Sequence, residues 1–431
     1  MTSTSFVELE QEQMFCDLLE IVSWNTVRVP SDDEFPYGAP IHAALNKLVD
    51  KVRAMGFTRL HRQGDHYMWV EIGDETRPLV AAISHLDTVS FVPNQWEHNP
   101  LGDEDATHLY GRGVVDDKCS IVQVLYALKY IEHLHQDYRI RLIVGCDEET
   151  DCRCMKKYIE MGEEMPCYGI IPDAKFPYIR SEKGLINVTF QLAKSSLGSK
   201  LAHMQGGICG NVIPNSAWME HAGTIMKYQG ISSHSADYSV GENAIIKMFD
   251  DLASDTNSLV SSWMRYFRAE AATLIVPIGT REIAFNPTFI EDVGEYVNLT
   301  FDSRIPIELD AAKTLAQVMR LLEIPSDALV RKHIGNGYVY SDDHPVIQAV
   351  QHAYHSYCHE HCPDKEDVEP LDIAGTTYAK YFSNCISFGP GFPLEHSYGH
   401  REDERLSKTS FAGAAIIYID ALVALARLCA Q

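Results

Sequence analysis

Short apolar runs that alternate with amphipathic helical patterns are the feature that most constrains the fold of this chain. Apolar runs at 79–83, 140–144 and 168–171 have the length of buried strands. Between and around them, apolar residues recur at helical spacing over 41–56 and 121–131. Strands that alternate with helices predict an α/β fold in which part of the sheet is parallel.

The pattern changes after residue 184, and this change predicts a second domain. The stretches 185–192 and 297–301 look like strands with one polar face, and helix-like stretches accompany them. The earlier α/β pattern resumes toward the C-terminus. We therefore predict one domain made of residues 1–184 and 337–431, with an α+β domain inserted at 185–336.

The charge balance restricts the class of partner. The 431 residues include 60 Asp and Glu against 36 Lys and Arg, a net charge of −24. Such a chain repels phosphate backbones and anionic lipid, so we expect no nucleic-acid and no membrane partner. The longest apolar stretch, Phe411 to Ala430, is interrupted by Asp420 and Arg427, which predicts a core helix rather than a membrane span.

The cysteines and the N-terminus favour a cytoplasmic location. Eleven cysteines lie at scattered spacings, and an odd number fits free thiols better than a disulfide framework. The first fifteen residues contain no basic stretch followed by an apolar run, so we expect no secretory signal.

Polar residues follow several of the expected strands. His85 and Asp87 come after the run at 79–83, and side chains two apart point the same way, so the carboxylate can orient an imidazole that ligates a metal. Taken alone, this pair fits a surface turn better than a metal site. Asp116 and Asp117 follow a glycine-rich loop and precede a helix, where one of them could bridge two cations or both could cap the helix.

Two further acidic positions end strands. Asp147, Glu148 and Glu149 follow the run at 140–144, and three adjacent carboxylates repel each other unless a cation neutralises them. The alternative is a solvated acidic turn that binds no cation. Asp173 follows the strand at 168–171. In open α/β sheets, ligands bind outside the carboxyl ends of the strands, so we expect these groups to converge.

The C-terminal segment EHSYGHREDERLS adds His396 and His400, although alone it could be only a charged loop. Histidines and carboxylates at several strand ends predict a site for two divalent cations, with Zn²⁺ favoured and Mn²⁺ or Co²⁺ possible. A carboxylate that binds no cation could then act as general base on a metal-bound water.

Together these motifs resemble the family of co-catalytic zinc peptidases and deacylases, and they do so in the right order over nearly the whole chain. That family includes peptidase V, carnosinase-like dipeptidases, carboxypeptidase G, aminoacylase, acetylornithine deacetylase and succinyl-diaminopimelate desuccinylase. The segments PDAKFP, EKG and GTTYA are most similar to the peptidase V-like dipeptidase branch. The resemblance implies a zinc-exopeptidase-like fold, with a mixed, mostly parallel sheet flanked by helices and an inserted lid domain.

The resemblance also implies roles for individual residues. Asp87 would orient the first histidine ligand, and Glu148 would be the general base. Asp116, two positions before the lysine, would be the bridging ligand, with Asp117 only its neighbour. The segment His400 to Glu404 matches a His followed four positions later by Glu, which favours His400 over His396. The implied metal ligands are His85, Asp116, Glu149, Asp173 and His400.

In the inserted domain, the resemblance implies substrate-binding residues. His234 would polarise the scissile carbonyl, and Asn211 and Arg304 would bind the substrate carbonyl and carboxylate. A loop that begins with Gly375 and Thr376 would line the site. Two departures from the family pattern, at Cys119 and Ala374, bear on pocket shape and metal affinity.

The implied function is hydrolysis of an amide bond in a dipeptide or short peptide by a metal-bridging hydroxide with a Glu general base. The alternative is an N-acyl amino acid deacylase of the acetylornithine deacetylase or succinyl-diaminopimelate desuccinylase type. The alternative outside the enzymes is a protein that senses peptides or amino acids on a hydrolase scaffold without activity. Both a monomer and a homodimer are compatible with the resemblance. The His- and Cys-rich segment at 351–363 is predicted to be a helix rather than a structural zinc site.

Overall fold

A computed structural model describes residues 1–29, 35–134, 138–254, 258–269 and 271–430. The chain forms two compact units. Unit 1 comprises Met1–Arg180, Tyr340–Asp372 and Thr377–Gln431, and unit 2 comprises Ser181–Val339 and Ile373–Thr376. The second unit therefore starts four residues before the expected position 185 and ends three residues after the expected 336, and it takes in one short segment of the C-terminal region.

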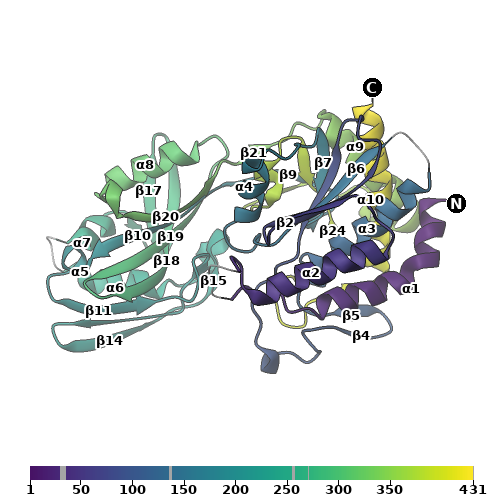
Figure 1. Cartoon of the computed structure of the whole chain (residues 1–431). Coiled ribbons are helices and arrows are strands. Elements are labelled where there is room, and N and C mark those ends of the chain that lie inside the picture. The colour runs from purple at the N-terminus through teal and green to yellow at the C-terminus, as the bar shows by residue number, and fades with distance from the viewer. Residues whose placement is uncertain (30–34, 135–137, 255–257, 270, 431) are drawn as a thin grey trace. The chain divides into compact units, whose positions relative to one another are not determined.

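Unit 1 is built around a six-stranded mixed sheet (Figure 1). Neighbouring strands are parallel for the pairs β3–β6, β3–β7 and β7–β23 and antiparallel for β1–β2 and β2–β6. This confirms the predicted α/β class with a mostly parallel sheet. In spatial order the strands are β1 (Leu60–Gln63), β2 (Tyr67–Gly73), β6 (Arg139–Gly145), β3 (Val80–His85), β7 (Tyr168–Ile171) and β23 (Cys385–Ser387).

The central strands are short apolar runs because helices cover them. Every residue of β3 and of β6 is buried. Since β3, β6 and β7 run parallel, their carboxyl ends meet at one edge of the sheet. The residues that follow these three strands are therefore brought together there.

Helices α3 (Lys118–Glu132) and α10 (Lys408–Cys429) contact β3 and β6. Helix α1 (Ser3–Val22) packs on both of these helices, and α9 (Pro345–His361) packs on α10. Within the described residues, α10 alone has the length and apolar composition of a membrane span, but 72% of its most apolar window is buried inside the structure. The side chain of Ser407 caps it by accepting the N–H of Ser410 at 3.0 Å. The expected C-terminal core helix is confirmed. Unit 1 also contains α2 (Ala39–Ala54) and α4 (Arg153–Glu160).

Unit 2 is an antiparallel sheet with helices on one face. Along β10, Ile186, Val188 and Phe190 alternate with Asn187 and Thr189, so that one face is apolar and the other polar. Its main strands are β10 (Gly184–Ala193), β11 (Leu201–Gly206), β13 (Ser216–His221), β14 (Thr224–Gln229), β17 (Thr273–Ile278), β18 (Arg281–Val293), β19 (Tyr296–Ile305) and β20 (Leu329–Gly335).

The helices of unit 2 cover the apolar face. Phe249 of α6 (Ala244–Leu252) and Trp263 of α7 (Leu259–Met264) have ring centroids 5.8 Å apart, and Trp263 lies 5.8 Å from Phe301 of the sheet. With α8 (Ala311–Leu321), these residues form a core separate from that of unit 1. The structure therefore has one hydrophobic core for each unit.

Candidate metal centre

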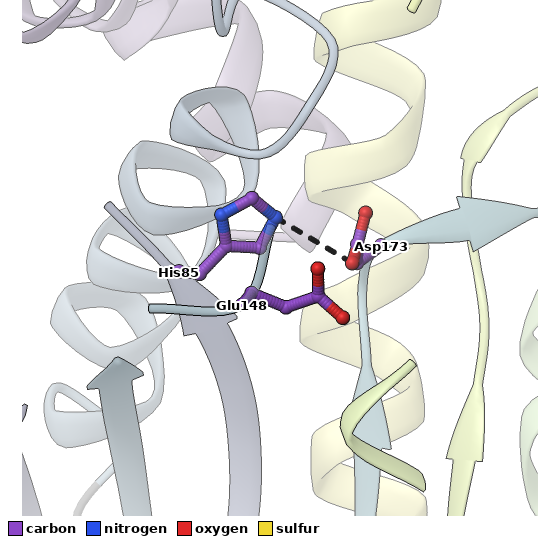
Figure 2. Close-up of side chains that lie close together, drawn as sticks. All are labelled: His85, Glu148 and Asp173. Atoms are coloured by element: carbon purple, nitrogen blue, oxygen red, sulfur yellow. Dashed lines mark ion pairs between the residues drawn. The ribbon is translucent and has the colours of Figure 1, made fainter. Parts of the chain in front are cut away.

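The carboxyl edge of the unit 1 sheet gathers most of the predicted ligands. His85 is the last residue of β3, Glu148 and Glu149 follow β6, and Asp173 follows β7. Asp116 lies in the loop that precedes α3. Figure 2 shows the imidazole of His85 directed toward Asp173, with the carboxylate of Glu148 beside them. Residues that lie up to 88 positions apart in the sequence therefore face one another.

Asp116 lies between two histidines. One of its carboxylate oxygens, Oδ1, is 3.0 Å from Nε2 of His85, and the other, Oδ2, is 2.9 Å from Nε2 of His400. His400 is also 3.0 Å from Oε1 of Glu149, and His85 is 3.6 Å from Oδ2 of Asp173. The five predicted ligands therefore form one chain of contacts, with Asp116 at its centre.

Two groups of these side chains can each hold a metal ion. His85, Glu148 and Asp173 form one group, and His85, Asp116 and Glu149 form the other, with one potential ligand atom of each residue within 4.8 Å of the others in its group. One imidazole nitrogen with two carboxylate oxygens is a donor set that suits Zn²⁺, Mn²⁺ or Co²⁺. The residues present therefore fit a divalent cation.

The carboxylates of the centre are crowded and half-buried. Burial, together with the neighbouring charge of Asp116, raises the pKa of Asp173 to about 6 and that of Glu149 to about 7. Burial also raises the pKa of Glu148 well above its usual value, and the charges of Asp173 and Glu149 add to that rise. Carboxylates in such surroundings favour a proton or a cation as a neighbour.

The two histidines and the carboxylates of the centre stabilise each other's charged forms. Partial loss of solvent around the exposed His400 would lower its pKa, but the charges of Glu149 and Asp116 outweigh this effect and raise that pKa to about 12. Burial likewise opposes the negative charge of Asp116, yet His400 and His85 hold the pKa of Asp116 well below its usual range. In the absence of a metal ion, the two imidazoles thus supply the positive charge that the neighbouring carboxylates favour.

Asp87 makes further contacts besides the expected one with His85. Its carboxylate oxygens accept the backbone N–H groups of Glu148 and Glu149, each at 3.1 Å. Nδ1 of His85 is 2.9 Å from the backbone carbonyl oxygen of Asp87 and 3.5 Å from Oδ1. The main chain of Asp87 therefore makes the shorter contact with the imidazole, and its side chain holds the acidic turn.

Glu404 organises the loop that carries Asp116, a role that sequence reasoning did not assign. It is completely buried, and its Oε1 accepts the backbone N–H groups of Gly113, Val115 and Asp116 at 3.1, 2.9 and 3.2 Å. Its Oε2 is 2.5 Å from Nη1 of Arg112. The signal that could have found it is its place four residues after His400, within the same motif.

Two other buried acids support the centre. Oδ2 of Asp117 accepts the backbone N–H of His85 at 3.2 Å, which leaves Asp116 as the aspartate that faces the histidines. Asp147 is 2.9 Å from Nη1 of Arg28, and it accepts the backbone N–H of Arg153 at 3.1 Å. Asp147 therefore anchors the turn that presents Glu148, another role that the sequence did not predict.

All five predicted substrate-binding residues lie in unit 2, in two clusters. His234 pairs with Val212, the residue after Asn211, in a short antiparallel ladder. His234 and Asn211 are both exposed. Arg304 donates from Nη1 to the carbonyl oxygen of Ala374 at 3.2 Å, beside Gly375 and Thr376. The five residues thus form two groups, one with Asn211 and His234 and the other with Arg304, Gly375 and Thr376.

Within the part of the chain that the structure describes, the remaining histidine and cysteine clusters form no further metal centre. His396 is exposed, and its Nε2 is 3.0 Å from Nη1 of Arg401. The His- and Cys-rich segment forms helix α9 and its end, as predicted, and no group of three potential ligands occurs there among the described residues. Of the two departures from the family pattern, Cys119 is buried and donates from Sγ to the carbonyl oxygen of Val115 at 3.2 Å.

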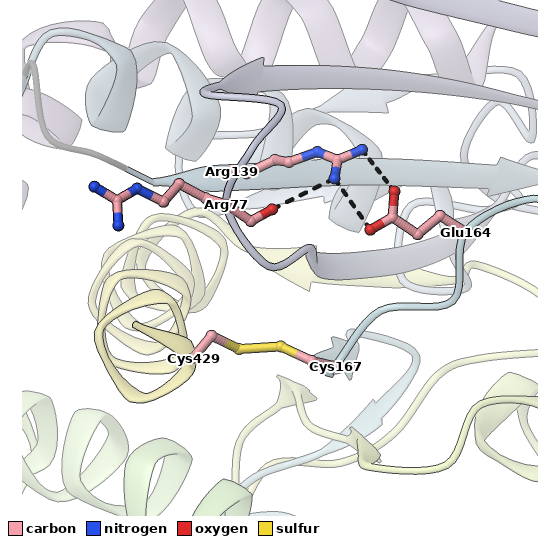
Figure 3. Close-up of a disulfide and its surroundings, with 5 residues drawn as sticks. All are labelled: Arg77, Arg139, Glu164, Cys167 and Cys429. Atoms are coloured by element: carbon pink, nitrogen blue, oxygen red, sulfur yellow. Dashed lines mark hydrogen bonds and ion pairs between the residues drawn. A yellow bond between two sulfur atoms is a disulfide. The ribbon is translucent and has the colours of Figure 1, made fainter. Parts of the chain in front are cut away.

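One pair of cysteines departs from the expectation of free thiols. Cys167 and Cys429 form a disulfide that links the segment before β7 to the end of α10, over 262 residues of sequence (Figure 3). The other nine cysteines are free, including Cys152 and Cys154 beside the acidic turn. A single bridge is not a disulfide framework, and the chain depends on its two apolar cores instead.

Comparisons with known proteins identify the family of this chain. Residues 81–424 match the sequence profile described as Peptidase family M20/M25/M40. A Bacillus subtilis (strain 168) protein named "Putative dipeptidase YtjP" is 25% identical over 471 aligned residues, which cover 97% of this chain and 98% of that protein.

Solved structures share the fold at low sequence identity. Human carnosine dipeptidase 1 has a TM-score of 0.60 at 15% identity, with 99% of each chain covered. The di-peptidase Dug1p of Saccharomyces cerevisiae has a TM-score of 0.62 at 12% identity, with 99% of this chain and 98% of that chain covered. Both likenesses span the two units.

Proposed function

This chain belongs to peptidase family M20/M25/M40, in its dipeptidase branch, and is a metallopeptidase; from that premise we propose that it hydrolyses the amide bond of a dipeptide or short peptide. The observation that carries the proposal is the position of Asp116, with one carboxylate oxygen toward each of two histidines. A carboxylate so placed suits a bridge between two cations.

We assign the ligands as follows. His85 and Asp173 would hold one cation, Glu149 and His400 the other, and Asp116 both. Zn²⁺ is the expected metal, with Mn²⁺ or Co²⁺ possible. When bound, the two cations supply Lewis acidity, which polarises the scissile carbonyl and lowers the pKa of water.

Glu148 is the proposed general base. It lies in the same group of potential ligands as His85 and Asp173. In the assignment proposed above, Asp116 completes the ligand set of each cation, so that Glu148 would bind neither. Its raised pKa suits a group that takes a proton from the attacking water and passes it to the leaving amine. Asp87 holds the backbone of Glu148 and so fixes the position of that base.

Unit 2 is proposed to be the lid and to supply the contacts that select the substrate. His234 would stabilise the oxygen of the scissile carbonyl, and Asn211 would assist it. Arg304, with the backbone at Gly375 and Thr376, would bind the carboxylate of the substrate, since a guanidinium forms charge-assisted pairs with carboxylates. Closure of such a lid excludes water during the reaction.

The experiment that tests the function is a substrate screen of the metal-loaded enzyme on dipeptides and on N-acetyl and N-succinyl amino acids. Hydrolysis of dipeptides supports the proposal, whereas turnover of acyl substrates alone would move the chain to the deacylases. Glu148→Gln should reduce kcat by at least about a thousandfold while the metal content is unchanged. Glu160→Gln, an exposed position in the same region, is the matched control.

A binding protein on a hydrolase scaffold predicts a different result. It would bind peptides without turning any of them over, with or without Glu148. The presence of five converging ligands and a base supports an enzyme instead.

We also propose a cytoplasmic location, in keeping with nine free cysteines, and cell fractionation tests it. We further propose that the protein is a monomer or a homodimer, which light scattering tests.

A further inference from the structure

A cavity of about 310 Å³ lies beside the candidate metal centre, within unit 1. Two of the residues that line it, Val115 and Ala174, are chain neighbours of the proposed ligands Asp116 and Asp173. The loop 395–398 lines another side and leads directly to His400. A group inside this cavity would therefore lie against the loops that carry three of the proposed ligands.

Two cationic side chains line the cavity and have no carboxylate partner among the described residues. Lys175, on β8 (Ala174–Lys175), is exposed and forms no ion pair or side-chain hydrogen bond with any residue that the structure describes. Arg405, on β25 (Arg405–Ser407), donates a hydrogen bond from Nη2 to the hydroxyl of Tyr398 and stacks over that ring at 4.0 Å. It too lacks an ion pair with a described carboxylate.

The acid that lines the cavity is already neutralised. Glu395 is 2.7 Å from Nζ of Lys365 and accepts the hydroxyl of Ser410 at 2.8 Å. Lys175 and Arg405 therefore leave the cavity with a local excess of positive charge, in a chain whose net charge is −24. Arg112, which lies on the loop that leads to Asp116, is by contrast paired with Glu404.

The volume of the cavity is large enough for one side chain. A volume of about 310 Å³ is at the lower end of the range for small-molecule sites, roughly 300–1,000 Å³. Gly391, on the opposite short strand, allows Lys175 to lie close, because an added Cβ would come within 3.1 Å of Cγ of that lysine. The glycine thus leaves room for the lysine along the cavity wall.

We propose that this cavity is a specificity subsite for a carboxylate side chain, and that the preferred substrate carries Asp or Glu on the acyl side of the scissile bond. The choice of the acyl side rests on the proposed function, in which Arg304 of unit 2 binds the C-terminal carboxylate. The cavity belongs wholly to unit 1 and so is available to the other residue. Lys175 and Arg405 would bind the side chain through charge-assisted hydrogen bonds.

The test separates binding from turnover. In calorimetric titrations of metal-loaded Glu148→Gln, Glu-Ala should bind at least about fivefold more tightly than the neutral isostere Gln-Ala. Adding Lys175→Met should remove that preference, Lys175→Arg should keep it, and Lys175→Glu should reverse it. Ala-Glu, whose acidic side chain is on the amine side of the scissile bond, should bind no more tightly than Ala-Gln. The control Lys200→Met, an exposed lysine of unit 2, should leave the preference as it was.

The outcomes distinguish the two proposals. If the wild-type enzyme hydrolyses dipeptides but Glu-Ala and Gln-Ala bind equally, or if Lys175→Met leaves the preference intact while circular dichroism shows a folded protein, the subsite is refuted and the peptidase remains. If Glu-Ala binds preferentially through Lys175 but no dipeptide is turned over by the wild type, the subsite stands and the peptidase function fails.

Discussion

The carboxylate of Asp87 accepts the backbone N–H of Glu148 at 3.1 Å. Its second oxygen accepts the N–H of Glu149 at the same distance. One buried side chain thus fixes both the proposed base and a proposed ligand, and at the same time its own main chain is 2.9 Å from the imidazole of His85. The centre depends on this residue without needing it as a ligand.

Replacement of Asp87 by Asn should weaken metal binding and turnover together. The amide nitrogen cannot accept a hydrogen bond, so one of the two N–H groups loses its partner. We expect metal affinity and kcat to fall by about 10- to 100-fold, as for other residues that orient metal ligands. Chelator competition and steady-state kinetics measure the two effects. Asp50→Asn, at an exposed helical position, should change neither.

Glu404 should be essential for the shape of the Asp116 loop. Glu404→Gln leaves Arg112 as a buried cation without an anionic partner, which should lower the free energy of unfolding by about 3–5 kcal/mol. Urea unfolding measures this loss. Arg112→Met combined with Glu404→Gln should cost less than the sum of the single changes, because the two side chains share one interaction. Strict additivity would contradict the assignment.

Glu71 provides a pH-dependent contribution to stability away from the centre. Burial would raise its pKa, but hydrogen bonds and charges from Arg139 and Arg141 outweigh it and hold the pKa of Glu71 below its ordinary 4.5. The ion pairs measure 3.0 and 2.7 Å. A lowered pKa in the folded state stabilises the protein at pH values above 4.5, and this contribution is lost as the pH falls through the folded-state value.

Glu71→Gln should therefore destabilise the protein at pH 7 by about 3 kcal/mol. The difference in free energy of unfolding between this variant and the wild type should shrink as the pH is lowered below 4.5. Urea unfolding at a series of pH values measures it. A difference that stays constant with pH would show that the charge of Glu71 contributes nothing.

Removal of metal should destabilise unit 1. A cation that binds only the folded state stabilises it by about 4 kcal/mol when its free concentration is a thousandfold above Kd. Dialysis against a chelator should therefore lower the melting temperature, and added Zn²⁺ should restore it. Elemental analysis should find two cations for each chain in the wild type and fewer in a His400→Ala variant. An unchanged melting temperature would argue against a structural contribution from metal.

Much of the fold could be predicted from local sequence patterns. Buried strands such as β3 and β7 contain short apolar runs, and the helices between them are amphipathic, so element type follows from neighbours in the chain. The inserted unit was recognisable because its strands alternate between apolar and polar residues. Its ends were displaced by three and four residues, since a change of pattern does not mark where backbone contacts stop.

The chain by itself also determined that a histidine and several acids follow the parallel strands, because strand ends are local features and parallel strands share one carboxyl edge. Only the tertiary structure decided that Asp116 faces two histidines, that the side chain of Asp87 holds the acidic turn, and that Glu404 holds a loop 288 residues away. Such contacts depend on the distance and direction between side chains from different segments, and spacing along the sequence does not encode those quantities.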